Sequence, residues 1–273
     1  MLNVSCIQLN SSDNLSHNID VVRRYSFQAI NEGADLLCFP ENVLLMSSSK
    51  ENLLNNSEIE KNNKGLVFFR ELAIKTGKWI SIGSLSIITD NDKLVNRSYL
   101  INSEGNIVGS YDKIHLFDVM LSKNLFYKES DTYASGNSAV LINTPIASFG
   151  LTICYDIRFP QLYRDLAISG ANIILVPSAF TKVTGEKHWH ILLRSRAIET
   201  GCYIIAAAQT GKHSKSRETY GHSLIVDPDG VILKDAGEKP GIISLNLDFD
   251  KVEKFRKKIP SLYLNPSYKL KII

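Results

Sequence analysis

Three polar residues follow predicted strands and carry the groups that acyl transfer needs. Cys154 ends one short apolar run, and Glu41 and Lys113 each follow another. A cysteine sulfur can attack a carbonyl carbon, a carboxylate can take the thiol proton, and an ammonium can stabilise the negative oxygen of the adduct. Ligand sites in α/β proteins collect at the carboxyl ends of strands, so the three side chains are expected to converge. Their convergence would supply a complete acyl-transfer site.

Each of the three residues also has an ordinary structural interpretation. A free cysteine is most commonly a small buried apolar residue, and a carboxylate or lysine after a strand is most commonly a helix cap or a solvated charge. Cys154 nevertheless lies where a strand turns sharply into a helix, so its sulfur would be exposed. Backbone NH groups at such a helix start, that of Tyr155 among them, favour an anion.

Apolar periodicity divides the chain into alternating strands and helices. Strands are predicted at 4–9, 34–39, 79–88, 94–102, 107–111, 139–142, 146–154, 172–176, 202–208, 222–226, 231–234 and 241–247. Helices are predicted at 14–32, 65–76, 161–169, 187–200 and 248–257. Residues 46–63 and 115–136 are predicted loops, and 89–92 a hairpin turn. Hairpins mixed with βαβ units indicate mixed sheets flanked by helices.

Length and charge are those of one α/β domain. The chain has 273 residues and a formal net charge of +3. Its most basic stretch, 251–258, alternates with apolar residues like an amphipathic helix rather than a nucleic-acid patch. We therefore expect a single domain over 1–273 and no nucleic-acid partner. Residues from about 259 to 273 mix apolar and polar side chains, and we expect them to form a tail that packs on another surface.

The cysteines and the N-terminus predict a cytoplasmic protein. Cys6, Cys38, Cys154 and Cys202 lie far apart without CxxC spacing, which argues against a disulfide framework or a zinc knuckle. The N-terminus lacks a charged region followed by a long apolar run, and no apolar stretch reaches the roughly eighteen residues that a membrane span needs. We expect no export signal and no membrane partner.

Three segments around the candidate residues resemble the nitrilase, or carbon-nitrogen hydrolase, superfamily. They are CFPEN at 38–42, SYDKIHLFD at 110–118 and GLTICYDIRFP at 150–160, and their order and approximate spacing agree with that family. Segments 176–213 and 220–230 are similar to its amidase branch called Nit, and within that branch to the deaminated glutathione amidases. The resemblance covers nearly the whole chain. It implies a four-layer α-β-β-α sandwich with two mixed sheets flanked by helices, and association into homodimers or higher homo-oligomers.

The resemblance also implies the catalytic residues and their roles. It implies a triad of Glu41 as base, Lys113 as stabilising cation and Cys154 as nucleophile, with a thioester intermediate and no cofactor. Glu129 matches the second glutamate that the family places near the triad, where it would hydrogen-bond Lys113 and hold the substrate side. A surface charge on a loop is the alternative for Glu129. The backbone NH of Tyr155 is a further expected donor to the oxyanion.

Other candidates for binding lie near the ends of later strands. Arg158 could bind a substrate carboxylate through two hydrogen bonds, but it could equally pair with a structural acid or a partner chain. Phe180 and Thr181 are positioned to line a pocket, although Phe180 could be core. His188 and His190 form an HxH pair. Because they would point to different faces of a helix and no third ligand is evident, we expect no metal there.

We expect an amidase that cleaves the terminal carboxamide of a small acidic molecule through a thioester at Cys154, with water as the second reactant, and releases ammonia. The resemblance implies deaminated glutathione as the preferred substrate. An ω-amidase acting on 2-oxoglutaramate-like amides, an N-carbamoyl amide hydrolase and a nitrilase would keep the same triad. A non-catalytic binding subunit on the same fold is the alternative of a different class. A papain-like protease would need a histidine base, and no histidine follows a strand as well as Glu41 does.

Overall fold

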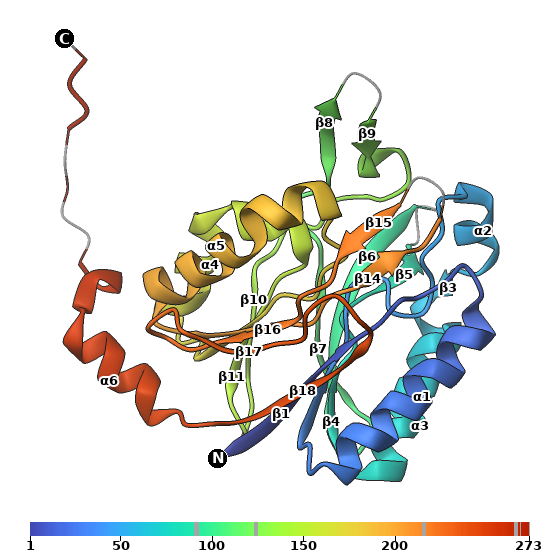
Figure 1. The fold of residues 1–273 in the computed structure, drawn as a ribbon, viewed down its shortest axis with the longest axis horizontal. Coiled ribbons are helices and arrows are strands. Elements are labelled where there is room, and N and C mark those ends of the chain that lie inside the picture. The colour runs from blue at the N-terminus through green and yellow to red at the C-terminus, as the bar shows by residue number, and fades with distance from the viewer. Residues whose placement is uncertain (90–92, 123–124, 215–216, 265–266, 268, 273) are drawn as a thin grey trace.

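The computed structural model describes residues 1–89, 93–122, 125–214, 217–264, 267 and 269–272. Within these residues two large β-sheets lie face to face, and helices cover the outer face of each sheet (Figure 1). The predicted α-β-β-α sandwich is therefore confirmed.

The first sheet has eight strands and contains the N-terminal part of the chain together with the last strand. In spatial order its strands are β18 (Gly241–Leu247), β1 (Leu2–Gln8), β2 (Leu36–Cys38), β4 (Trp79–Ser81), β6 (Leu94–Ile101), β5 (Leu85–Ile88) and β3 (Glu58–Ile59), with β7 (Ile107–Asp112) also paired to β6. β1, β2 and β4 run parallel, whereas β6 is antiparallel to β4, β5 and β7. The sheet is thus mixed, and Glu41 follows the central parallel strand β2.

The second sheet has six strands. In spatial order they are β10 (Val140–Asn143), β11 (Ser148–Leu151), β12 (Ile173–Leu175), β13 (Tyr203–Ala206), β16 (Leu224–Val226) and β17 (Ile232–Asp235). β11, β12 and β13 run parallel, so the segments that follow them emerge at one edge of the sheet. Two further hairpins pair β8 (Asp118–Ser122) with β9 (Leu125–Lys128), and β14 (Thr210–Lys212) with β15 (Glu218–Tyr220). The first of these hairpins stands out from the body of the molecule at the top of Figure 1.

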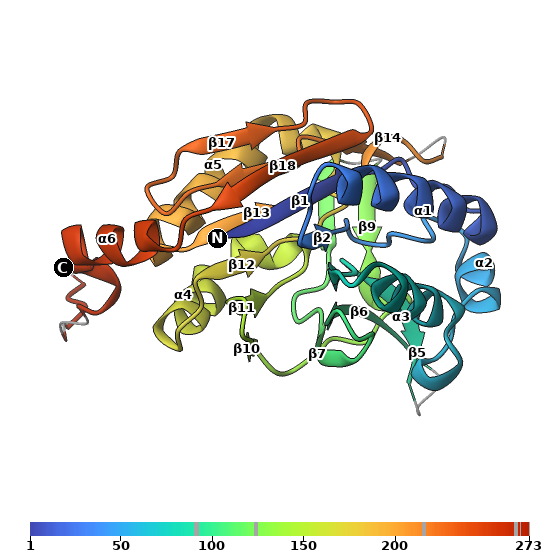
Figure 2. The same cartoon turned by 90° about the horizontal axis from the view of Figure 1, so that it is seen from below.

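Helices form the two outer layers. The α-helices are α1 (Leu15–Asn31), α2 (Lys50–Asn55), α3 (Lys64–Thr76), α4 (Pro160–Ile168), α5 (Lys182–Thr200) and α6 (Asp250–Lys258). Short 3₁₀ helices are η1 (Glu60–Asn62), η2 (Glu129–Asp131), η3 (Cys154–Arg158) and η4 (Pro260–Leu262). Figure 2 shows α1 and α3 together at the right of the molecule and α4 and α5 on its other side. Asn14 caps α1 by accepting a hydrogen bond from the backbone NH of His17 at 3.0 Å, and Gly77 ends α3 in the left-handed conformation.

The period of two along β1 explains why the core has two parts. Val4 and Cys6 point to one face and pack in a cluster with Phe149 of the second sheet. Ile7 points to the other face and packs with Val22 of α1 and other residues of the outer layer. Because successive strand residues alternate between faces, one apolar strand supplies both the layer between the sheets and the layer beneath the helices.

The structure corrects several predicted elements. The predicted strand 79–88 is broken into β4 and β5 at Gly83, where φ is +84° and a Cβ would lie 2.2 Å from the carbonyl oxygen of Pro40. The predicted loop 46–63 contains α2, whose N-cap Ser49 accepts a hydrogen bond from the NH of Asn52 at 3.2 Å. The predicted irregular segment 115–136 contains β8, β9 and η2, and the sequence prediction lacked the hairpin of β14 and β15. Residues 90–92 of the predicted turn lie outside the described residues.

The C-terminal residues lie apart from the core. Leu262 is buried, but Leu264, Leu270 and Ile272 expose 64%, 84% and 89% of their surface. In Figure 1 the chain beyond α6 extends away from the sandwich. Among the described residues, no helix has the length and apolar character that a membrane crossing requires.

Candidate active site

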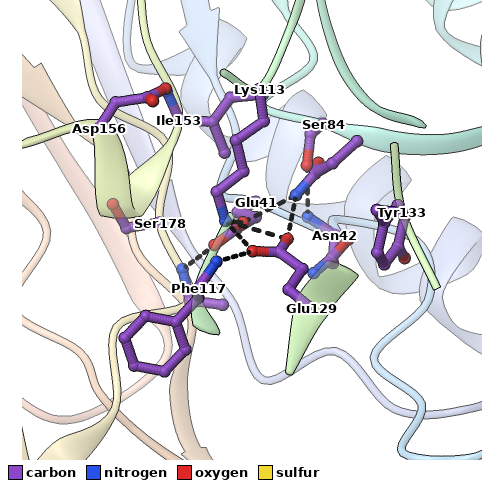
Figure 3. A network of polar contacts seen from close by, with 12 residues as sticks. Glu41, Asn42, Ser84, Lys113, Phe117, Glu129, Tyr133, Ile153, Asp156 and Ser178 are labelled. Carbon is purple, nitrogen blue, oxygen red and sulfur yellow. Dashed lines mark hydrogen bonds and ion pairs between the residues drawn. The ribbon is translucent and has the colours of Figure 1, made fainter. Parts of the chain in front are cut away.

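The carboxylate of Glu41 is buried, and both of its oxygens accept hydrogen bonds. Glu41 lies just beyond β2 and exposes only 3% of its surface. Its Oε1 accepts hydrogen bonds from Nδ2 of Asn96 and from Nζ of Lys113, each at 2.8 Å, and its Oε2 accepts one from the backbone NH of Ala179 at 2.8 Å (Figure 3). Ala179 follows β12, so this contact joins the ends of strands from both sheets.

Lys113 lies between two carboxylates. It follows β7, exposes 2% of its surface and contacts Glu129 as well as Glu41. Its Nζ lies 3.0 Å from Oε1 and 2.9 Å from Oε2 of Glu129, whose Oε2 also accepts the backbone NH of Phe117 at 2.6 Å. A buried ammonium between two carboxylates leaves one negative charge in excess, which the backbone NH groups and Asn96 help to stabilise.

The charges of this cluster reinforce one another. Burial by itself would lower the pKa of Lys113, but the charges of Glu129 and Glu41 outweigh it and hold that pKa well above the usual lysine value. Burial would raise the pKa of Glu41, yet the Lys113 ammonium and the hydrogen bonds to the carboxylate keep it below its usual value. Lys113 is therefore a cation and Glu41 an anion over the neutral pH range.

Cys154 occupies a strained backbone position at the start of η3. Its φ is +48°, in the left-handed region that few residues other than glycine adopt, and its NH donates to the carbonyl oxygen of Pro177 at 2.9 Å. The predicted strand 146–154 ends earlier, at Leu151. The turn carries the thiol to Glu41, with which it forms a hydrogen bond. The NH of Tyr155 lies in the first turn of η3, where backbone donors have no partner within the helix.

The thiol of Cys154 is protonated at rest. Burial, followed by the negative charge of Glu41, raises its pKa, and the opposing effect of Lys113 is smaller. The Lys113 field alone therefore does not generate a thiolate. A nucleophilic role would require the thiol proton to pass to a base, and the Glu41 carboxylate lies beside the thiol.

Asp156 joins the Cys154 segment to the Lys113 segment. It is fully buried, and its Oδ2 accepts hydrogen bonds from the NH of Ile153 at 2.8 Å and from the hydroxyl of Tyr111 at 2.7 Å. Its Oδ1 accepts the NH of His115 at 3.1 Å. Tyr111 and His115 flank Lys113 in the sequence, so one carboxylate fixes the nucleophile and the cation relative to each other.

The cavity that contains the candidate catalytic residues has a volume of about 490 Å³. Glu41, Lys113, Glu129 and Cys154 line it, as do the predicted binding residues Tyr155, Phe180 and Thr181. Sequence reasoning missed four basic residues that also line the cavity: Lys50, Lys128, His213 and Arg217. Burial lowers the pKa of His213, which favours its neutral form. The other three side chains bring positive charge to the lining, where the ammonium of Lys128 also pairs with Asp131 at 2.9 Å.

Arg158 lies beside two residues of the cavity lining, and its expected role with a substrate carboxylate stays a prediction. It is not among the described residues that line the cavity. Its guanidinium lies over the rings of Tyr155 and Phe180, 5.8 and 5.3 Å from their centroids, and its NH2 atom lies 3.2 Å from Nδ1 of His188. Arg158 therefore packs against Tyr155 and Phe180, two residues that line the cavity.

The HxH pair is separated as predicted, since its two rings have different partners. His188 contacts Arg158, whereas Nε2 of His190 lies 3.1 Å from Oδ2 of Asp235. No local sequence pattern indicated that Asp235, at the end of β17, would approach α5.

Comparison with known proteins identifies the family. The sequence profile of the family Carbon-nitrogen hydrolase matches residues 3–257. The chain is 39% identical over 269 residues to a deaminated glutathione amidase of Yersinia enterocolitica, and the match covers 96% of this chain and 92% of that protein. A family match over most of the chain and a relative of nearly the same length agree with the geometry of the site.

Two solved structures share the fold. Saccharomyces cerevisiae Nit3, described as a member of branch 10 of the nitrilase superfamily, superposes with a TM-score of 0.86 at 31% identity, over 95% of this chain and 94% of that one. The NitFhit protein of C. elegans superposes with a TM-score of 0.90 at 31% identity, over 97% of this chain. This chain spans only 65% of the NitFhit chain.

Proposed function

Because the chain belongs to the carbon-nitrogen hydrolase family and is an amidase, we propose that it hydrolyses small acidic amides through a thioester at Cys154. One observation carries this proposal. The Glu41 carboxylate bonds both the Lys113 ammonium and the Cys154 thiol, and all three line one cavity. A nucleophile, its base and a cation are thus in contact at a place that a small molecule can enter.

The first half of the reaction forms the thioester. Sγ of Cys154 attacks the amide carbon while its proton passes to Glu41, and the carbonyl oxygen becomes an oxyanion. Lys113 and the NH of Tyr155 stabilise that charge, and loss of one such donor typically lowers the rate about a hundred- to a thousandfold. The tetrahedral adduct then expels the amine, which takes the proton from Glu41.

The second half restores the enzyme. Water attacks the thioester carbon as Glu41, again a carboxylate, takes one of its protons. The new tetrahedral adduct expels the sulfur of Cys154, which recovers a proton from Glu41, and a carboxylic acid product leaves. Glu129 holds Lys113 in place, since both of its oxygens accept hydrogen bonds from that ammonium.

The basic residues of the cavity favour an acidic substrate. Lys50, Lys128 and Arg217 line a cavity that also contains the excess negative charge of Glu41 and Glu129. Basic residues of the lining can pair with substrate carboxylates while the reacting amide reaches the buried thiol. Deaminated glutathione carries a carboxylate at each end, and it is the preferred substrate on the similarity to the Yersinia enterocolitica amidase.

The expected release of ammonia needs to be narrowed for this substrate. Deaminated glutathione has secondary amides along its chain and no terminal carboxamide, so its leaving group is the amine of a peptide fragment. Ammonia is the product only from primary amides such as 2-oxoglutaramate, from N-carbamoyl compounds or from nitriles. The nature of the amine product therefore distinguishes the candidate substrate classes.

A substrate panel with one variant tests the proposal. Wild-type protein is assayed with deaminated glutathione, 2-oxoglutaramate, an N-carbamoyl amino acid and a simple nitrile, and the highest kcat/KM identifies the class. Cys154→Ala should release no product from any of them while its thermal midpoint stays near that of the wild type. An active Cys154→Ala protein would refute the thioester. A folded wild-type protein that turns over none of the four compounds would instead favour a binding subunit.

We also infer the form and location of the protein. We propose that 1–273 form one domain, that the described tail residues after Leu262 pack on a second copy of the chain, and that the protein works in the cytoplasm without a nucleic-acid or membrane partner. All four cysteines are unpaired and buried, which fits a reducing compartment. The exposed apolar side chains of the tail support a homo-oligomer.

A further inference from the structure

Three potential metal ligands meet on the outer side of the second sheet. They are His190 on α5, His222 just before β16 and Asp235 at the end of β17. One ligand atom from each lies within 4.8 Å of the other two. Nδ1 of His222 lies 2.9 Å from Oδ1 of Asp235, and Nε2 of His190 lies 3.1 Å from Oδ2 of the same carboxylate. None of the three is among the described residues that line the cavity.

The spacing of these atoms suits a small cation. A tetrahedral zinc ion binds imidazole nitrogen and carboxylate oxygen at about 2.0–2.2 Å, which separates neighbouring ligand atoms by about 3.4 Å. The observed separations of 2.9 and 3.1 Å, and the limit of 4.8 Å, bracket that value. Small rotations of the side chains would therefore be enough to surround an ion.

The backbone around His222 holds its ring toward the other two residues. His222 has a φ of +53°, in the left-handed region, and its NH donates to the carbonyl oxygen of Gly237 at 2.7 Å. Its carbonyl oxygen accepts Nε1 of the buried Trp189 at 2.8 Å, and its ring stacks on that of Tyr220 at 4.4 Å. The NH of Gly237 in turn donates to Oδ1 of Asp235 at 2.8 Å. A ligand held in this way loses little further freedom when it binds.

The surroundings of the cluster are acidic and open to water. Besides Asp235, the carboxylates of Glu186 and Glu238 act electrostatically on the ring of Tyr220, which stacks on His222. Glu186 precedes His190 by one turn of α5 and lies on the same side of the helix. The side chains of His190, His222 and Asp235 expose 28%, 19% and 34% of their surface, so an ion can reach them from solvent.

We propose that His190, His222 and Asp235 bind one divalent transition-metal ion of the zinc type per chain. Two imidazoles and one carboxylate favour Zn²⁺ and its neighbours over Mg²⁺ or Ca²⁺, which prefer oxygen ligands only. Three protein ligands leave a coordination position for water. The ion would link α5 to strands β16 and β17, and it takes no part in the chemistry at Cys154.

Zinc binding to the full chain tests the site. Metal-free protein in a phosphine reductant that does not chelate zinc is titrated with ZnCl₂ by calorimetry, in the Cys154→Ser background so that the active-site thiol does not contribute. We expect one Zn²⁺ per chain and a rise of the thermal midpoint by about 2 °C or more at saturating Zn²⁺. MgCl₂ at the same concentration should produce neither effect.

Variants assign the binding to these residues. His190→Gln and Asp235→Asn should each weaken binding about tenfold or more and remove the thermal shift. His222→Asn should do the same, and asparagine tolerates the left-handed backbone at that position. His188→Gln, two residues away on the same helix, is the matched control and should bind as the wild type does. Failure of the unmodified site to bind Zn²⁺, or unchanged binding in His190→Gln and Asp235→Asn, would overturn the proposal.

Discussion

Both carboxylate oxygens of Glu129 accept hydrogen bonds from Nζ of Lys113, at 3.0 and 2.9 Å. The same ammonium lies 2.8 Å from Glu41 on its other side. Lys113 therefore cannot move toward a substrate without leaving one of two carboxylates, and Glu129 fixes where the cation waits. Glu129 is best described as a positioning residue, because it acts through Lys113 rather than on the reacting atoms.

Glu129→Gln should lower kcat about tenfold or more while KM changes less. The amide keeps the shape of the side chain but removes its charge, so Lys113 is drawn toward Glu41 and makes that carboxylate a weaker base. Steady-state kinetics on the best substrate measure the effect. Glu71→Gln is the control, because Glu71 is an exposed carboxylate on α3 and is not among the described residues that line the cavity. Wild-type kinetics in Glu129→Gln would contradict the role.

The dependence of kcat/KM on pH should be flat between about pH 5 and pH 9. Glu41 has a pKa below its usual value of 4.5, and Lys113 has one well above its usual value of 10.5. The thiol of Cys154 also titrates above its usual value, because of burial. A histidine base would instead give an acid limb near pH 6.5. Initial rates measured from pH 5 to pH 9, on a substrate without a titratable group in that range, distinguish a glutamate base from a histidine base.

Unfolding of the protein should not affect the measured pH dependence of kcat/KM. The pKa of Glu41 is lower in the folded protein than in the unfolded chain. Its charged carboxylate therefore contributes its full stabilisation of the fold at any pH above the unfolded-state pKa. That contribution is lost only as the pH falls through the folded pKa. Circular dichroism at each pH provides the check, and unfolding above pH 5 would point to another group.

Iodoacetamide should modify Cys154 well before the other cysteines. Cys154 lines the cavity, whereas Cys6, Cys38 and Cys202 lie in the core and expose 2% of their surface or less. Alkylation needs access as well as a base, and Glu41 supplies the base beside Cys154. Peptide mass spectrometry during a time course measures the four rates. Equal labelling of all four thiols would favour a binding protein with an inert cysteine.

The sequence was sufficient to select Glu41, Lys113 and Cys154 as candidates that would lie together, because each follows a strand. Glu41 and Cys154 follow parallel strands, and Lys113 follows β7. Strand ends can be recognised from the apolar pattern, and the topology then brings them together. What the pattern could not predict is the backbone at Cys154, since a φ of +48° is imposed by contacts such as its bond to Pro177.

Residues that act through tertiary contacts were missed for a common reason. Asn96 lies inside β6, where a polar side chain between apolar ones usually marks the solvent face, yet it bonds Glu41. Asp156 resembles an ordinary acid in a first turn, but it is fully buried between two segments. Arg217 precedes β15, a short strand without a clear alternating pattern. Their partners are 55, 45 and 38 residues away in the chain, beyond any local pattern.

Arg217→Gln should raise KM for an acidic amide about ten- to a hundredfold with little change in kcat. One nitrogen of its guanidinium donates to the carbonyl oxygen of Ala179 at 2.7 Å, and the group lies 5.0 Å from the ring centroid of Tyr127. Arg217 also lines the cavity, and we expect its guanidinium to bind a substrate carboxylate there. Arg23→Gln, on the exposed side of α1, is the charge-matched control. An equal rise of KM for a neutral amide would indicate lost packing rather than lost charge recognition.

A chain that ends after Tyr263 should associate more weakly than the full chain while its monomer stays folded. The truncation removes Leu264, Leu270 and Ile272, whose apolar surface is mostly exposed, but it keeps Leu262, which is buried against the core. Apolar surface that no part of its own chain covers favours a second copy, so its removal should lower the association constant. Light scattering over a dilution series compares the two proteins, with the thermal midpoint as the check on folding. A full chain that is monomeric at micromolar concentration would refute the proposed packing of the tail.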